Sequence, residues 1–227
     1  MIVSVHQPQY LPWLGYFDKI DRADVFVLLD TVQYKKNEWQ NRNRIKTAQG
    51  PQWLTVPVTY RYPQRICEVG VNGCERWQHR QRQALATNYR RAPHWGSLEE
   101  LFEDVFSRSW ESVAALNIHV VKRLAAVLGI ATPMYTASEL GSFPEDPDER
   151  LIALTKHFGA GIYLAGCGGH EYMDLSKYER AGIEVVFQDY RHPRYDQLFG
   201  EFESHLSVVD LIYNHGEKSL PILRGLS

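Results

Sequence analysis

Short apolar runs rich in β-branched residues recur along the chain and predict buried strands. Runs of roughly four to eight such residues, bounded by polar or turn residues, are typical of strands inside a sheet. They occupy residues 2–5, 25–29, 53–58, 162–165 and 183–187. We therefore expect the sheet of the protein to be built from these segments.

Between these runs the apolar positions recur every three or four residues, which predicts helices. Helices are expected over residues 14–21, 75–91, 97–106, 112–128, 146–159 and 207–214. In the helix over 112–128 an apolar stripe includes Leu116 and Val120, and Gly129 is placed to end it. The helix over 146–159 has a strong start, because Asp146 is a good N-cap and Pro147 occupies the first helical position.

Strands that alternate with helices indicate an α/β fold with a parallel or mixed sheet and helices on both of its faces. The middle of the chain, at about residues 75–130, is predicted to be a helical subdomain inserted over the sheet. A chain of 227 residues is long enough for one full core and short for two. We therefore expect residues 1–227 to form a single domain.

Composition and charge narrow the classes of function. Hydrophobic residues make up 44% and charged residues 23%, which excludes disorder over most of the length. The net charge of -2 gives no overall field that would attract nucleic acid or an anionic membrane. The three cysteines include no CxxC pair, and no apolar run could span a bilayer. We expect a cytoplasmic protein with no nucleic-acid partner and no membrane insertion.

The first candidate site follows the first predicted strand. His6, Gln7 and Tyr10 lie between that strand and the next helix. In open α/β sheets ligands bind at the carboxyl ends of strands, next to helix N-termini. These side chains could bind a phosphate or a sugar hydroxyl, and His6 could move a proton near neutral pH. The simpler alternative is a turn whose polar side chains only satisfy backbone groups.

The second candidate site begins at Asp30, which ends the second predicted strand. The loop over residues 31–44 combines basic, amide and aromatic side chains, which suits a clamp for phosphate or carboxylate with a stacking face for a ring. The candidate binding residues in it are Gln33, Lys36, Trp39, Asn41, Arg42 and Asn43. The alternative is a solvated basic loop, which is the usual role of charge runs.

The third candidate is the glycine-rich turn after the strand over 162–165. Gly166, Gly168 and His170 could let the backbone approach a ligand closely. The turn matches neither the dinucleotide fingerprint nor the P-loop. Cys167 and His170 could act as nucleophile and base, although a small residue in a tight turn is the simpler interpretation. No HxH, HExxH or CxxC spacing occurs, so no metal is expected in the site.

Two other polar segments carry weaker signals. Residues 189–197 follow another strand end, and the helix over 75–91 carries Arg76, Arg80, Arg82, Arg90 and Arg91. Charge on one helix is typical of a solvated face or a partner surface.

Taken together, these segments resemble the WbqC-like family. The resemblance covers residues 1–46, the WLTVPV segment at 53–58, YLAGCGG at 163–169, FQDYRHPRY at 187–195 and LSVVDLIYNHG at 206–216. It implies an enzyme of surface-polysaccharide (O-antigen) biosynthesis that acylates the amino group of a sugar, with glycine as one candidate acyl donor. It implies functional roles for His6, Gln7, Tyr10, Asp30, Gln33, Lys36, Trp39, Asn41, Arg42 and Asn43.

The expected reaction is amide formation on a nucleotide-linked amino sugar by an N-acyl or aminoacyl transferase. His6 and Asp30 are the expected catalytic residues, since either could take the proton that an attacking amine loses. The residues give no signature for a cofactor, and ATP and an acyl donor are the candidates. The alternative is a non-catalytic protein that binds a sugar nucleotide or acts as a scaffold. A homo-oligomer and a complex with other polysaccharide-pathway enzymes are both compatible with the sequence.

Overall fold

A parallel sheet of five strands forms the centre of the computed structural model, which describes residues 1–73 and 76–226. The strands are β1 (Ile2–His6), β2 (Val25–Leu28), β7 (Met134–Thr136), β8 (Ile162–Ala165) and β9 (Glu184–Phe187). Their order is β7-β2-β1-β8-β9, and every neighbouring pair is parallel. The expected α/β fold is confirmed, and β1 lies in the middle of the sheet.

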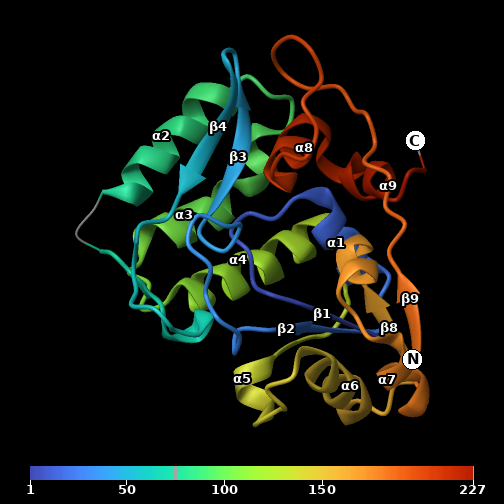
Figure 1. The fold of residues 1–227 in the computed structure, drawn as a ribbon. Coiled ribbons are helices and arrows are strands. Elements are labelled where there is room, and N and C mark those ends of the chain that lie inside the picture. Colours follow the sequence, from blue (N-terminus) through green and yellow to red (C-terminus); the bar gives the residue numbers. More distant parts are fainter. Residues whose placement is uncertain (74–75, 227) are drawn as a thin grey trace.

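Helices cover both faces of this sheet, because side chains of a strand point alternately to its two faces. On one face Phe26 and Leu28 of β2 join a core cluster with Phe17 of α1 (Leu14–Asp21). On the other face Val25 and Val27 join a cluster with residues of α6 (Pro147–His157) and α7 (Leu175–Arg180). Figure 1 shows α5 (Ala137–Leu140), α6 and α7 on one side of the sheet, and α1 and α4 (Val113–Leu128) on the other.

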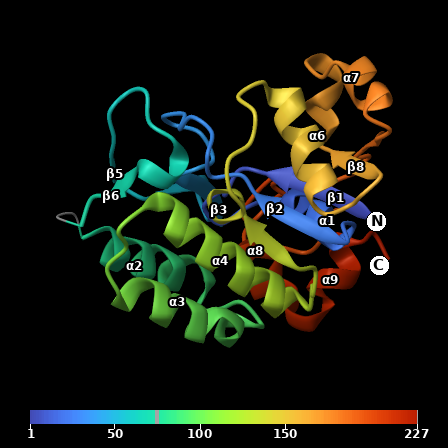
Figure 2. The ribbon, with the colours of Figure 1, turned by 90° about the horizontal axis from the view of Figure 1, so that it is seen from below.

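The middle of the chain is helical, as expected. It forms α2 (Trp77–Tyr89), the 3-10 turn η2 (Trp95–Leu98), α3 (Glu99–Ser107) and α4, and these helices lie side by side (Figure 2). The Ser112 hydroxyl accepts a hydrogen bond from the Ala115 amide, and Gly129 ends α4 with a φ of 80°. Asp146 caps α6 in the predicted way. The predicted start of the first of these helices, Glu75, and Cys74 lie outside the described residues.

The predicted strand over residues 53–58 is confirmed for its first three residues, whereas its place in the parallel sheet was wrong. The structure has an antiparallel hairpin there, formed by β3 (Arg42–Thr47) and β4 (Gly50–Thr55), outside the parallel sheet. The end of the predicted basic loop is therefore a strand. In β3 the alternate residues Asn43 and Ile45 are buried while Arg42 and Arg44 are half-exposed, which is the pattern of a strand with one covered face.

Several short elements were not predicted from the sequence, because they are too short to show a hydrophobic periodicity. They are β5 (Val58–Thr59), β6 (Gly70–Val71), β7, and the turns η1 (Ile66–Glu68) and η3 (Cys167–Glu171). The chain ends in α8 (Val208–His215), η4 (Gly216–Lys218) and α9 (Ser219–Leu223).

A buried carboxylate fixes the C-terminal helices to the middle of the chain. Asp210 of α8 accepts hydrogen bonds from the hydroxyls of Tyr89 at 2.7 Å and Tyr195 at 3.0 Å, and from the side-chain amide of Gln197 at 2.8 Å. Burial raises the pKa of Asp210, and these three donors act against that rise. Among the described residues, no helix is long and apolar enough to cross a membrane.

Candidate functional site

The centre of the sheet opens at the carboxyl ends of β1 and β8. The pairing of β1 with β8 ends at Ser4 and Leu164, whereas β1 stays paired with β2 as far as His6. The chain runs from β1 to β2 and β7 on one side and adds β8 and β9 on the other, so the strand order reverses between β1 and β8. Such a switch point is where open α/β sheets bind ligands. His6 and the Gly166 turn lie on its two sides.

His6 is held as a neutral imidazole at this switch point. Its Nδ1 lies 3.1 Å from the carbonyl oxygen of Gln7. A carbonyl can only accept, so Nδ1 carries the hydrogen and Nε2 keeps its lone pair. Burial, and then the positive charge of Lys19, lowers the pKa of His6 to about 3. The ring therefore presents an unprotonated Nε2 throughout the physiological pH range.

Lys19 of α1 is the residue of this site that sequence analysis missed. Its side chain is buried, and its Nζ donates a hydrogen bond of 3.2 Å to the carbonyl of Val5, next to His6. Burial lowers the pKa of Lys19 to about 8, against the opposing influence of nearby Cys167. No sequence signal marks Lys19, because its burial, like that of all residues from Leu14 to Ile20, is set by tertiary packing. The ammonium group supplies a desolvated positive charge at the end of β1.

Asp30 lies at the same edge of the sheet, but both oxygens of its carboxylate accept hydrogen bonds that stabilise the fold. One carboxylate oxygen accepts from the Ser138 amide at 3.0 Å and the other from the Ser138 hydroxyl at 2.6 Å. The side chain is buried. Asp30 thus holds the first turn of α5 against the end of β2.

We expect Asp30→Ala to lower the free energy of unfolding by about 1–3 kcal/mol, because the two hydrogen bonds between the buried Asp30 carboxylate and Ser138 are lost. Urea denaturation of the purified protein measures this change. Ser138→Ala removes only the hydroxyl bond and should have the smaller effect. An unchanged free energy of unfolding in Asp30→Ala would contradict the structural role.

The amide and tyrosine side chains predicted to bind substrate make hydrogen bonds to other groups of the protein. The Tyr10 hydroxyl donates to the Gln81 side chain at 2.6 Å within the core. Asn41 donates to the carbonyl of Val56 at 2.9 Å, and Asn43 donates to that of Leu11 at 2.7 Å. The side-chain oxygen of Gln7 accepts from Gln40 at 2.6 Å, and this bond joins the end of β1 to the basic loop.

The hairpin presents an aromatic–arginine platform made of Trp39, Arg42, Arg44 and Trp53. The guanidinium carbon of Arg42 lies 4.3 Å from the Trp53 ring centroid, and that of Arg44 lies 5.8 Å from it. The two tryptophan rings are 5.5 Å apart and are 37% and 42% exposed. Lys36, on the neighbouring loop, is also exposed. The platform offers a ring surface and positive charge to an anionic ligand.

A polar cleft of about 1010 Å³ lies beside the ends of β2 and β7. Thr31 and Gln33, which follow β2, line it together with Arg65 and Arg150. Gln33 is thus a predicted site residue that faces open space. The cleft is at the upper end of the range of roughly 300–1,000 Å³ that holds small ligands and cofactors.

The Gly166 turn forms η3, at the other side of the switch point. Gly166 is its N-cap residue and Gly168 is exposed. The ring of His170 stacks on Phe187, with 3.4 Å between the centroids. The close approach falls at Gly169, where a Cβ atom would lie 2.8 Å from the Met173 sulfur and 2.9 Å from the Phe187 ring. Within the described ranges, no group of three or more His, Cys, Asp or Glu side chains could hold a metal ion.

Comparison with known proteins agrees with the resemblance seen in the sequence. The chain is 34% identical over 226 residues to the uncharacterized protein Rv1507c of Mycobacterium tuberculosis, covering 98% of this chain and 97% of that protein. No solved structure matches it. The model of the WbqC-like protein family matches residues 7–222, which include nearly all of the site. The chain therefore belongs to the WbqC-like protein family.

Proposed function

We propose that this protein is an enzyme of surface-polysaccharide (O-antigen) synthesis that transfers an acyl or aminoacyl group to the amino group of a nucleotide-linked sugar. The observation that carries the proposal is the pair His6 and Lys19 at the switch point. An imidazole with a free nitrogen and a desolvated ammonium next to each other suit the two tasks of amide formation, which are taking up the proton of the amine and stabilising the oxyanion.

In the reaction, the amine nitrogen attacks the carbonyl carbon of the acyl donor and a C–N bond forms. The carbonyl electrons move onto oxygen, and Nε2 of His6 takes the proton that the amine loses. The charge of Lys19 stabilises the resulting oxyanion. Collapse of this intermediate breaks the bond to the leaving group of the donor, which departs with the electron pair and takes the proton from His6, so that the imidazole is neutral again. Asp30 keeps its structural bonds to Ser138 during these steps.

The nucleotide part of the substrate is assigned to the polar cleft and the loop beside it. The cleft opens next to β2. β2 is the immediate neighbour of β1, and neighbouring strands of a sheet lie about 5 Å apart. Gln33 and the remaining donors of Arg65 and Arg150 face a diphosphate there, while Arg65 also pairs with Glu145 and Arg150 also donates to the carbonyls of Pro144 and Glu145. Lys36 and the aromatic–arginine platform add positive charge and a stacking surface.

Arg42→Lys tests the role of the platform. We expect it to weaken binding of a nucleotide-linked amino sugar about tenfold, because lysine keeps the charge but loses the planar group that stacks on Trp53. Titration calorimetry with a uridine-diphosphate amino sugar measures the change. The matched control, Arg61→Lys on an exposed turn, should bind as the unmodified protein does. Equal affinity of both variants would show that the platform does not contribute to binding of the sugar nucleotide.

The reaction itself is tested by mass spectrometry. The protein is incubated with a nucleotide-linked amino sugar and either glycine with ATP or an acyl-CoA. The expected product is heavier than the sugar by the acyl or aminoacyl group. Binding of the sugar nucleotide without a product from any donor would instead support a non-catalytic binding protein.

A scaffold is the second candidate, favoured by the exposed arginines of α2. In that case Arg82→Glu with Arg90→Glu should abolish function in cells, while His6→Ala should leave it intact. We expect the opposite pattern.

A further inference from the structure

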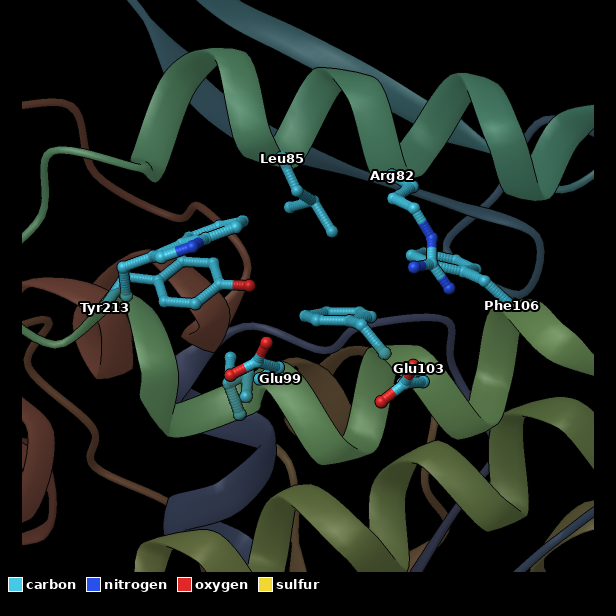
Figure 3. A pocket seen from close by; sticks show the side chains of 9 residues that line it. Arg82, Leu85, Glu99, Glu103, Phe106 and Tyr213 are labelled. Atoms are coloured by element: carbon cyan, nitrogen blue, oxygen red, sulfur yellow. The ribbon is translucent and has the colours of Figure 1, made fainter.

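A second, smaller cavity lies in the helical middle of the chain, away from the sheet edge. Its volume is about 130 Å³ and α2, η2, α3 and α8 form its walls (Figure 3). Its lining residues are Arg82, Leu85, Trp95, Leu98, Glu99, Phe102, Glu103, Phe106 and Tyr213. It shares no residue with the switch point, the platform or the polar cleft.

Aromatic rings form most of the inner wall. The ring centroid of Tyr213 lies 5.0 Å from that of Trp95 and 6.5 Å from that of Phe102. Phe102 stacks on Phe106 at 5.3 Å. The inner wall ends at Leu85 and Leu98, which are fully buried. This surface suits an apolar group and, on the ring faces, a cation.

Three charged side chains converge on this aromatic cavity from opposite helices. Glu99 and Glu103 are four positions apart on α3, so they share one face of that helix. Figure 3 shows both carboxylates turned toward the cavity, and Arg82 reaching into it from α2. In the part of the chain that the structure describes, no hydrogen bond or ion pair joins Arg82 to either carboxylate. Two carboxylates and one guanidinium are thus available to a ligand.

We infer that this cavity binds a free α-amino acid with an aliphatic side chain. Arg82 pairs with the carboxylate of the ligand through its two-pronged guanidinium. Glu99 and Glu103 hold the ammonium group beside the ring faces. The side chain packs on Phe102, Leu85 and Leu98. The volume of about 130 Å³ is well below the roughly 300–1,000 Å³ of sites for larger ligands, so a nucleotide does not fit.

This inference does not depend on the proposed reaction, since it concerns a separate site. The test is titration calorimetry of the full chain with L-leucine as the probe. Two analogues separate the contributions of the two charged groups of leucine to binding. Isoamylamine lacks the carboxylate, and isocaproate lacks the amino group. We expect L-leucine to bind more tightly than either analogue.

The decisive variant is Arg82→Gln, an exposed position whose replacement leaves the core unchanged. It should raise the dissociation constant of L-leucine about tenfold or more, which corresponds to about 1.4 kcal/mol. Binding of isoamylamine, which has no carboxylate, should not change. Arg90→Gln, at the C-cap of the same helix but outside the cavity, is the matched control and should bind leucine as the unmodified protein does. Glu99→Gln should weaken the binding of leucine and of isoamylamine alike.

Three outcomes would overturn the inference. They are the absence of leucine binding to the unmodified protein, equal affinity for leucine and isoamylamine, and leucine binding to Arg82→Gln that matches the Arg90→Gln control. Circular dichroism of each variant verifies that it is folded before binding is measured.

Discussion

Replacing His6 with alanine is expected to lower the turnover of amide formation by about 10²-fold, the lower end of the usual contribution of a general base, because a lowered pKa makes the imidazole a weaker base. The Michaelis constant should change much less, because proton transfer acts mainly in the transition state. Steady-state kinetics with the nucleotide-linked amino sugar measures both quantities. His79→Ala, which changes an exposed histidine of α2, is the matched control and should keep full activity. Similar losses in both variants would contradict the assignment.

The lowered pKa of His6 also leads to a prediction about its protonation. Since the pKa of His6 is lowered to about 3, its imidazole should remain neutral between about pH 8 and pH 5. Nitrogen NMR of the His6 ring follows this directly. A protonation step inside that range would show that the ring is less buried than the structure has it.

Replacing Lys19 with methionine should raise the stability of the protein and lower its activity. Burial lowers the pKa of Lys19 from 10.5 to about 8, so below both values the charged group makes the folded state about 3 kcal/mol less stable. Methionine has a similar length and no charge, but it leaves the Val5 carbonyl without its donor. We expect a net gain of about 2 kcal/mol in the free energy of unfolding near pH 7, together with a loss of about 10²–10³-fold in turnover.

The sign of the pH effect provides an independent check. Between about pH 8 and pH 10 the unfolded chain binds the Lys19 proton and the folded chain releases it. The contribution of Lys19 therefore makes the unfolding free energy of the unmodified protein rise relative to that of Lys19→Met in this window. Urea denaturation at several pH values compares the two. Lys156→Met, at an exposed position on α6, should show no such difference from the unmodified protein. A constant difference between the unmodified protein and Lys19→Met would mean that Lys19 is not desolvated.

The position of His6 could be predicted from the sequence, whereas that of Lys19 could not. His6 directly follows a short apolar run, and the carboxyl ends of parallel strands meet at one edge, so local pattern was enough. The burial of Lys19 depends on what packs around α1 from distant parts of the chain, including α9. A helix read alone places Asp18 and Lys19 on a solvent face, because local spacing contains no information about a second covering layer.

The residues of the basic loop illustrate a different limit. Asn41 and Asn43 were predicted to bind substrate because amides donate and accept hydrogen bonds. The structure uses the same chemistry to satisfy the backbone carbonyls of Val56 and Leu11. Sequence cannot distinguish these uses, because the partner is decided by the tertiary fold. The alternation of the polar Asn43 and the apolar Ile45 with the basic Arg42 and Arg44 did contain the signal for β3, but too few apolar residues supported it.

The central position of β1 also has a consequence for how the protein emerges from the ribosome. The Ser4 hydroxyl donates to the carbonyl of Leu164, 160 positions later in the chain. At a synthesis rate of about 5–20 residues per second, β8 follows β1 by roughly 10–30 s. Throughout that interval the edge of β1 that pairs with β8 has no partner strand, whereas β2, the partner of the other edge, follows β1 closely in the chain. An unpaired edge can join the same edge of a neighbouring nascent chain. Slower translation prolongs this exposure, and a chaperone that covers the β1 edge has until the synthesis of β8 to act.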